Sequence, residues 1–487
     1  MSTPPQQGHL LKVFGLGMAI ILVISNIIGS GVFKKVAPMS ELMGSPALVL
    51  LAYVLAGVIT IFGVLCAAEA ASMFPDSGGA YTWLSEMYGK VFGFMYGWTC
   101  FTVILTAAIA SLAVIFAQAL GSFINLPHLS PQLESITWLA NSPDPIRPFA
   151  DMGAKLVAVA LIWVLTFFNI RGAKTGGNIS MVFTAAIVAG IAVVIGISFF
   201  GGTGNMENLQ AQVRNVTTNL PESKFSSAAE VSIWAAISVM IVAMRHAFWA
   251  YEGWISLGYL GGEIKNPGRN LPKALILGIL GVIVIYVVVN TAYLYAMPIN
   301  NLVHPGEGES AVAAVRVMDY VLGNKGGVLI AGLILISTFG CANTTILSAS
   351  RIYYSMAQKG EFFKSAAFCH PVFNTPSKSL VMQATWASIL ALSGSFDFLT
   401  TIIILAAFVF YGAVAAGIIV LRRKMPDAER PYKTLGYPWV PVIFVLFSIA
   451  LMIVSFIESP VYGGIGLLLI FSGLPFYYFS WRHPRNS

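Results

Sequence analysis

The stretch Ile28-Gly29-Ser30-Gly31-Val32-Phe33 interrupts the first apolar run of the chain, residues 14–36. A run of about 20 apolar residues predicts a helix that crosses a bilayer core about 30 Å thick. A break in such a helix exposes backbone N–H and C=O groups, which is tolerable only where protein or a water-filled cavity meets them. The stretch therefore predicts a helix broken at a functional site inside a membrane.

The composition of the whole chain agrees with a membrane protein. Of its 487 residues, 57% are hydrophobic and only 10% are charged, whereas a soluble domain carries about 25% charged residues. The apolar runs predict an all-α membrane protein with twelve transmembrane helices. The predicted spans are residues 14–36, 46–73, 92–123, 155–170, 179–200, 232–260, 271–297, 327–356, 379–393, 398–421, 440–456 and 462–479.

A second break is predicted at Glu252-Gly253, in the middle of the sixth span. Breaks at matching places in two halves indicate a transporter's binding site, although a single glycine cluster can simply allow close helix packing. The two breaks lie in the first and the sixth span, which is an offset of five helices. This offset predicts a five-plus-five inverted repeat, with residues 14–200 as the first repeat and 232–421 as the second. Residues 1–13 are then a tail, 201–231 an extracellular loop, and 422–487 two appended helices with a short C-terminal tail.

The distribution of Lys and Arg predicts the orientation. Clusters such as Arg422-Arg423-Lys424 favour cytoplasmic N- and C-termini in a cell (inner) membrane. The pair Lys34-Lys35 lies on the opposite side and departs from this rule. The formal charge of +7 is scattered over short loops, so no nucleic-acid partner is expected. The four cysteines show no metal-ligand spacing, and no signal peptide is expected.

The first break predicts the chemistry of the ligand. Beyond it, the N–H groups of Gly29, Ser30, Gly31 and Val32 lack intrahelical partners and stand at the positive end of a helix dipole. They form a cradle for a carboxylate, which glycine allows to approach the backbone. Carbonyls freed in spans one and six can accept from an ammonium group. A cradle for a carboxylate that faces acceptors for an ammonium group suits a zwitterionic α-amino acid. An alternative for Ser30 is that its hydroxyl bonds the backbone of its own helix.

Four motifs, in order along the chain, resemble the amino acid–polyamine–organocation (APC) superfamily, and most closely its L-type amino acid transporter branch. They are residues 28–33; Glu69 with residues 74–81; residues 249–254 running on to 272; and Asn343 with Arg351. The resemblance implies the LeuT-type fold, alternating access and an aromatic gate at Trp249. The site residues that we predict are Ile28, Gly29, Ser30, Gly31, Val32, Trp249, Ala250, Tyr251, Glu252, Gly253, Phe339 and Asn343. Within this set, Tyr251 is interpreted first as a packing residue, as is its neighbour Trp254.

Glu252 lies near the predicted midplane of the membrane, where a carboxylate is costly and marks a functional site. Three interpretations stay open. It could pair with Arg245 as a structural element, bind a cationic or polar substrate side chain, or carry a proton during the transport cycle.

The sequence departs from the family in two places. Many sodium-independent relatives have a lysine in the fifth helix, where this chain has Ile187. A small cation could instead be coordinated by hydroxyl oxygens of the eighth span, from Ser337, Thr338, Thr344 or Thr345. Residues 122–154, where animal L-type subunits carry a linking cysteine, contain none, so no disulfide-linked heavy chain is expected.

These features predict a secondary active transporter, a uniporter or exchanger, of neutral L-amino acids. The alternative is a carrier of cationic amino acids or polyamines that uses Glu252, and the rival classes are a channel and a substrate-sensing receptor. No metal, nucleophile or phosphate motif is visible, so neither an enzyme nor a cofactor is expected. Further charges are interpreted as architecture: Glu69 pairs with a basic loop residue, Arg351 is an inner-gate or snorkelling charge, and the cluster Arg422–Lys424 faces anionic lipid headgroups.

Overall fold

The computed structural model describes residues 10–138, 147–210, 233–303, 312–393, 396–458 and 460–481. These residues form helices and their connections, with one isolated backbone bridge between Phe14 and Ile264 and no strand. Most of the predicted tail 1–13, residues 211–231 of the predicted extracellular loop and the last six residues lie outside the described residues.

The first half of the chain runs from the broken first helix to a long fifth span. Its elements are α1 (Leu16–Ile27), α2 (Gly31–Lys34), α3 (Val36–Met43), α4 (Pro46–Met73), α5 (Ala80–Tyr88), α6 (Lys90–Thr99), a π-helical turn (Cys100–Ile104), α7 (Leu105–Gly121), α8 (Pro131–Glu134), α9 (Met152–Ile170), α10 (Ala173–Phe200) and α11 (Met206–Gln210).

The second half begins with another broken helix. Its elements are α12 (Ile233–Tyr251), a 3₁₀ segment η2 (Trp254–Glu263), α13 (Pro267–Ala296), α14 (Asn300–Val303), α15 (Ala313–Leu322), α16 (Lys325–Gln358), a short 3₁₀ turn (Lys364–Ala367), α17 (Ser377–Ser393), α18 (Phe396–Lys424), α19 (Trp439–Glu458), α20 (Pro460–Phe471), α21 (Gly473–Phe476) and a final π-helical turn (Tyr477–Trp481).

Each of the twelve predicted spans falls on helix. Within the described ranges, eight helices are long and apolar enough to cross a membrane, and two shorter apolar helices are Leu16–Ile27 and Gly463–Phe479. The first span is divided at the predicted place, because α1 ends at Ile27 and α2 begins at Gly31. The sixth is divided too, and its second part is a 3₁₀ helix rather than the α-helix that the apolar pattern suggested.

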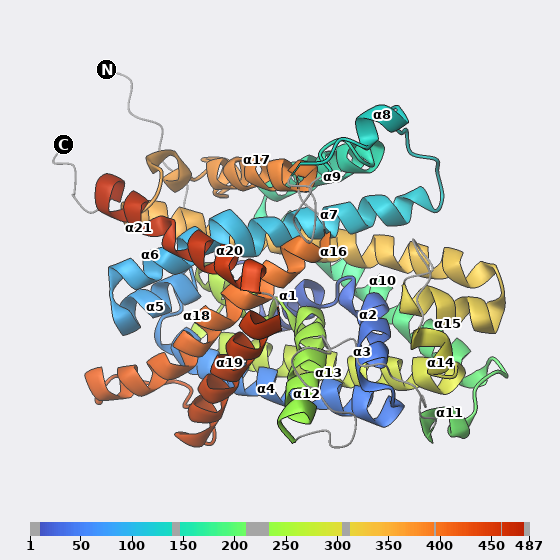
Figure 1. Cartoon of the computed structure of the whole chain (residues 1–487). Coiled ribbons are helices and arrows are strands. Elements are labelled where there is room, and N and C mark those ends of the chain that lie inside the picture. The colour runs from blue at the N-terminus through green and yellow to red at the C-terminus, as the bar shows by residue number, and fades with distance from the viewer. Residues whose placement is uncertain are drawn as a thin grey trace.

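The broken helices lie inside the bundle. Helix α1 packs against α13, α10, α16 and η2, while α16 lies along α7 and α10. In Figure 1 α5, α6 and α21, the last labelled helix, are at the left-hand end of the molecule, and α8, α11, α14 and α15 are at the opposite, right-hand end. The two ends of the bundle therefore differ, and we call them the terminal end and the far end.

The terminal end is closed by hydrogen bonds between the two broken helices. The backbone N–H groups of Val13 and Phe14 donate to the carbonyl of Glu263 at 2.9 and 3.0 Å, and Lys265 donates to the carbonyl of Phe14 at 2.8 Å. These bonds attach the segment that leads into α1 to the end of η2.

The pairing of two charges at this end bears on their predicted roles, and for Arg351 it excludes the snorkelling interpretation while the inner-gate interpretation stays a prediction. Arg351 does not snorkel: its guanidinium is fully buried and donates to both carboxylate oxygens of Glu263, at 2.6 and 3.2 Å. Within the cluster Arg422–Lys424, Arg422 binds Glu69 at 2.7 Å, with Arg430 at 3.3 Å from the same carboxylate. The predicted pairing of Glu69 with a basic loop residue is confirmed. Arg423 and Lys424 are exposed, so contact of the cluster with lipid headgroups stays a prediction.

Candidate functional site

The break in the first helix presents unpartnered backbone donors. Gly29 N–H donates to the carbonyl of Ile27 at 2.8 Å, so it is satisfied, contrary to prediction. Within the described chain, no hydrogen-bond acceptor lies in reach of the N–H groups of Ser30, Gly31 and Val32. The Ser30 hydroxyl is also buried without a partner. The cradle thus has three backbone donors and one hydroxyl.

The break in the sixth span depends on a glycine. Helix α12 ends at Tyr251, and Gly253 follows with φ +108°, a left-handed conformation that other residues rarely adopt. A Cβ at Gly253 would lie 2.5 Å from the carbonyl oxygen of Asn26. Glycine is needed both for the turn and for the close approach of the two breaks.

Two side chains join the breaks directly. The Asn26 amide donates to the carbonyl of Gly253 at 2.9 Å. The hydroxyl of Tyr286, on α13, lies 3.1 Å from the carbonyl of Ile27 and 2.8 Å from that of Ala250. Sequence reasoning missed both residues. Asn26 left a signal in the sequence, since it is an amide inside an apolar span, two residues before the motif that begins at Ile28.

Helix α16 supports the first break from the other side. Ser337 donates to the carbonyl of Ile28 at 3.0 Å, and Thr345 donates to the Asn26 side chain at 2.9 Å. The carbonyls of Ile27, Ile28 and Ala250 are therefore already bonded within the protein. The prediction that freed carbonyls of both breaks await an ammonium group is too broad, because these three have partners.

A cavity of about 40 Å³ lies between the two breaks. Its volume has room for a few water molecules but not for an amino acid, so substrate entry requires side chains to move. Six of the twelve predicted site residues line it, namely Gly29, Ser30, Gly31, Trp249, Glu252 and Gly253. Thr345, predicted only as a hydroxyl ligand for a small cation, also lines it. The lining residues that sequence reasoning missed are Asn26, Ile27, Ile104, Leu105, Ala108, Leu112, Ser256, Cys341 and Ile403.

The other predicted site residues face neighbouring helices. Asn343 bonds the amide of Asn169 and the carbonyl of Gly176, both at 2.8 Å, and so ties α16 to α9 and α10. Phe339 stacks on Phe183 with ring centroids 4.3 Å apart. Neither lines the cavity, because each side chain is turned toward α9 or α10.

Three backbone positions and one tyrosine of the predicted set also lie behind the cavity wall. Ile28, Val32 and Ala250 are buried with their side chains in the core. The Tyr251 hydroxyl donates to the carbonyl of Tyr53 at 3.2 Å, which agrees with its interpretation as a packing residue.

Glu252 faces the cavity and accepts a hydrogen bond from the hydroxyl of Tyr411, on α18. Its predicted pairing with Arg245 is wrong, since Arg245 lies 3.3 Å from Glu458 at the end of α19. A carboxylate on the wall of an apolar cavity is costly unless it is neutralised or paired. The substrate and proton interpretations therefore remain.

The comparisons agree with this geometry. Residues 14–477 match the family model described as "Amino acid permease". The chain is 30% identical to the "Serine/threonine exchanger SteT" of Bacillus subtilis, with 97% of this chain and 98% of the relative covered. It is also 30% identical to the "b(0,+)-type amino acid transporter 1" of Rattus norvegicus, covering 98% and 89%. Identity to the mouse "Large neutral amino acids transporter small subunit 2" is 29%, covering 97% and 82%.

The chain belongs to the amino acid permease family. It is a multi-pass membrane protein and an amino acid transporter, because the family match spans nearly the whole chain and its relatives are transporters and exchangers. The resemblance read from the four motifs is confirmed.

Trp249 of the permease occupies the place expected of a gate. It lines the cavity, and its ring centroid lies 6.0 Å from the Lys35 ammonium, the outer limit of a cation–π contact. Its role as a mobile lid over the substrate stays a prediction.

The permease has Ile187 buried at the position predicted for the missing lysine. Among the hydroxyl groups predicted for a small cation, that of Thr344 lies 2.8 Å from the Ser25 hydroxyl and 2.7 Å from the Ser180 hydroxyl. Among the described side chains no group of three or more His, Cys, Asp or Glu could hold a metal ion.

We expect Gly29→Val to abolish substrate binding by the permease, and Gly29→Ala to weaken it only slightly. A Cβ at Gly29 would lie 3.3 Å from Leu112 and 3.4 Å from Cys341, whose side chains can adjust. The two further methyl groups of valine would fill the cavity. A binding assay on purified protein should show a loss well beyond tenfold for valine, which is more than about 1.4 kcal/mol.

Gly31 is a poorer position for this test. A Cβ there would lie 2.6 Å from the backbone Cα of Ala250, so a substitution separates the two broken helices instead of filling ligand space. A Gly31→Val variant is therefore expected to disturb the packing of the two breaks as well as substrate binding. If Gly29→Val were well folded by size-exclusion chromatography and bound substrate normally, the site would be misplaced.

Proposed function

We propose that the protein is a secondary active transporter of neutral L-amino acids that works by alternating access around the cavity between the two breaks. The observation that carries this proposal is the set of unpartnered N–H groups of Ser30 and Gly31 on the cavity wall, followed in the chain by that of Val32. Backbone donors at a helix start suit a carboxylate. The names of two relatives, a serine/threonine exchanger and a large neutral amino acids transporter subunit, support neutral substrates.

The architecture that we propose has twelve spans and the five-plus-five inverted repeat of residues 14–200 and 232–421. Its support is that the breaks fall in the first helix of each repeat and face each other. The Lys/Arg bias of the loops supports cytoplasmic termini in a cell (inner) membrane.

In this mechanism the chain itself supplies every group that contacts the substrate, with no cofactor. The donors of Ser30–Val32 fix the carboxylate, and the apolar side chains of Ile104, Leu112 and Ile403 surround the substrate side chain. Trp249 moves to admit the substrate, since the closed cavity is too small to contain it. We propose exchange rather than uniport, on the strength of the exchanger among the relatives.

A second candidate is transport of cationic amino acids or polyamines. It is favoured by one observation, the carboxylate of Glu252 on the cavity wall without an ion-pair partner at Arg245. The absence of a cysteine from residues 122–154 argues against a disulfide-linked heavy chain in either case.

Uptake into proteoliposomes across a panel of amino acids tests the function. We expect saturable uptake of neutral amino acids that is accelerated by preloading the vesicles with unlabelled substrate. Such counterflow separates a carrier from a channel or a receptor. Saturable uptake of lysine or arginine alone would favour the second candidate, and no counterflow for any amino acid would reject a carrier.

We expect decarboxylated analogues to compete far less well than the parent amino acids. Without the carboxylate, the N–H groups of Ser30–Val32 lose their acceptor, at about 1–3 kcal/mol for each buried group left unpaired. Competition for labelled uptake by an amino acid and its matching primary amine measures the difference. If the amine competed as well as the amino acid, the cradle would not be the binding site of the carboxylate, and a polyamine carrier would be favoured.

A further inference from the structure

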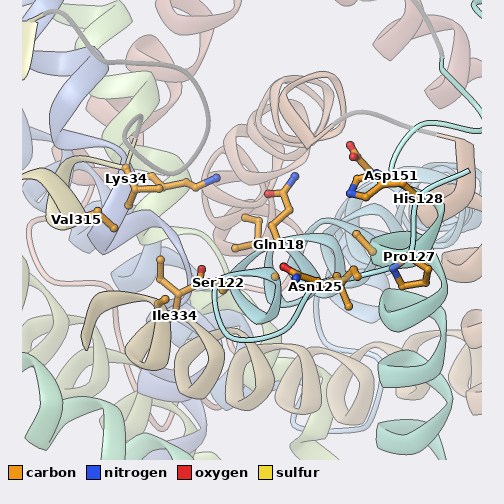
Figure 2. A pocket seen from close by; sticks show the side chains of 17 residues that line it. Lys34, Gln118, Ser122, Asn125, Pro127, His128, Asp151, Val315 and Ile334 are labelled. Carbon is orange, nitrogen blue, oxygen red and sulfur yellow. The ribbon is translucent and has the colours of Figure 1, made fainter. Parts of the chain in front are cut away.

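The two ends of the bundle present their charges differently. At the far end, Lys34 and Asp151 line a cavity of about 600 Å³, so residues of opposite charge contribute to one enclosed wall (Figure 2). Helix α13 runs from the terminal end, where η2 precedes it, to the far end, where α14 follows it. At its start Arg269 and Lys273 are exposed. The outer surface of α13 at the terminal end therefore carries charges of one sign.

The basic residues of α13 stand where the helix itself disfavours them. The helix begins at Pro267, with Arg269 and Lys273 in its first two turns and the exposed Lys265 just before it. Cations are unfavourable near the positive N-terminal end of a helix dipole, and like charges four residues apart repel each other. The first turn contains no acidic residue, and within the described chain none of the three forms an ion pair. An external anion relieves this repulsion.

The same face of α13 continues as an apolar strip. Leu277, Leu280, Val284 and Val288 are all exposed. Together with Lys273 they are spaced three or four residues apart, which places them on one side of the helix. From Lys273 to Val288 the axis rises about 22 Å, more than half the thickness of a bilayer core, which is about 15 Å. The strip is therefore long enough to contact an acyl chain of one leaflet along its whole length.

A neighbouring loop indicates the level of the membrane surface. A Cβ at Gly268 would lie 3.6 Å from the ring of Pro431, so the loop after α18 lies beside the start of α13. This loop leads to Trp439, which is exposed at the start of α19. Exposed tryptophan side chains are typical of the headgroup layer. Arg269 and Lys273 therefore stand at the depth where lipid phosphates lie.

We propose that this face of α13 binds an anionic phospholipid of the adjacent leaflet, with its phosphate on Arg269 and Lys273 and one acyl chain along the strip 277–288. The phosphodiester supplies the negative charge that the described chain does not, and the acyl chain covers the apolar strip. A soluble phosphate satisfies only the first of these conditions, so the combination favours a lipid. The proposal does not depend on which substrate the permease transports.

Quenching of a label by brominated lipids tests the site. All four native cysteines are buried, so Leu277→Cys, one turn from Lys273, gives an accessible thiol for a fluorescent label. In mixed vesicles we expect brominated phosphatidylglycerol to quench the label more strongly than brominated phosphatidylcholine. Arg269→Gln and Lys273→Gln should each lower this preference about fivefold, which is about 1 kcal/mol. Equal quenching by the two lipids, or a preference that survives both changes, overturns the proposal.

The matched control is Lys325→Gln, which removes an exposed lysine at the far end and should keep the preference. Glycerophosphoglycerol, the headgroup without acyl chains, tests the other source of phosphate. At the same concentration as the lipid it should leave quenching unchanged, and if it abolishes the preference, the site binds a soluble anion and no lipid. If the double variant does not fold, about 1 M NaCl replaces it, because salt screens exposed charges. A preference that persists at this salt concentration also rejects the site.

Discussion

Replacing Arg351 by methionine is expected to destabilise the protein by about 3–5 kcal/mol, the usual cost of breaking a buried ion pair from one side. Both partners are fully buried, and the guanidinium binds two oxygens of Glu263 as well as the carbonyl of Leu347 at 2.6 Å. Removing Arg351 strands a carboxylate in the bundle. Thermal unfolding in detergent and the yield of monodisperse protein measure the loss.

The control is the pair formed by Arg245 and Glu458, whose side chains are 17% and 22% exposed. Arg245→Met should cost less than Arg351→Met, since both members of this pair are partly exposed and the carboxylate left behind is less buried. The double variant Glu263→Gln with Arg351→Met should regain part of the stability, because no charge is left unpaired. Equal and small losses for Arg351→Met and Arg245→Met would show that burial does not set the strength of these pairs.

Replacing Glu252 by glutamine is expected to remove the pH dependence of net uptake while exchange of bound substrates persists. Its carboxylate faces the cavity, and Arg245 is engaged with Glu458. When the substrate is neutral, a proton is the group left to neutralise this charge as the site closes. Net uptake with an inward pH gradient, compared with counterflow at equal pH, separates the two activities.

The matched control for this prediction is Tyr411→Phe, which removes the hydrogen bond to Glu252 and keeps the carboxylate. We expect it to keep a pH-dependent uptake. If Glu252→Gln instead lost only lysine and arginine uptake, the carboxylate would bind a cationic side chain and the second candidate function would stand. A variant with normal substrate range and pH profile would contradict both roles.

The helices of this fold could be predicted from hydrophobicity, because a bilayer imposes a minimum apolar length on each span. The predicted 46–73 coincides with α4 (Pro46–Met73), and both breaks lie within a few residues of Gly29-Ser30 and Glu252-Gly253. The 3₁₀ form of η2 was not predictable, since the apolar period of a buried segment in lipid does not distinguish 3₁₀ from α-helix. Its packing against α1 and α16 is a tertiary effect.

The part of the site that consists of backbone groups could be predicted from the sequence. The side-chain hydrogen bonds could not, because their partners are distant in the sequence. The cradle at Ser30 and Gly31 followed from the broken helix. The hydroxyl of Tyr286 bonds carbonyls 259 and 36 positions away in sequence, a relation that one sequence does not contain. Asn343 was misplaced for the same reason: an amide on α16 can turn toward the cavity or toward Asn169, and only packing decides.

The bonds between the two broken helices bear on how tightly transport is coupled. The breaks are tied by Asn26 and Tyr286, and the terminal ends by Phe14 and Glu263. Moving one helix without the other would break several hydrogen bonds at once, each worth about 0.5–1.5 kcal/mol. Joint motion is therefore favoured over slippage, so the permease should show little leak and a coupling ratio that stays constant as substrate gradients change.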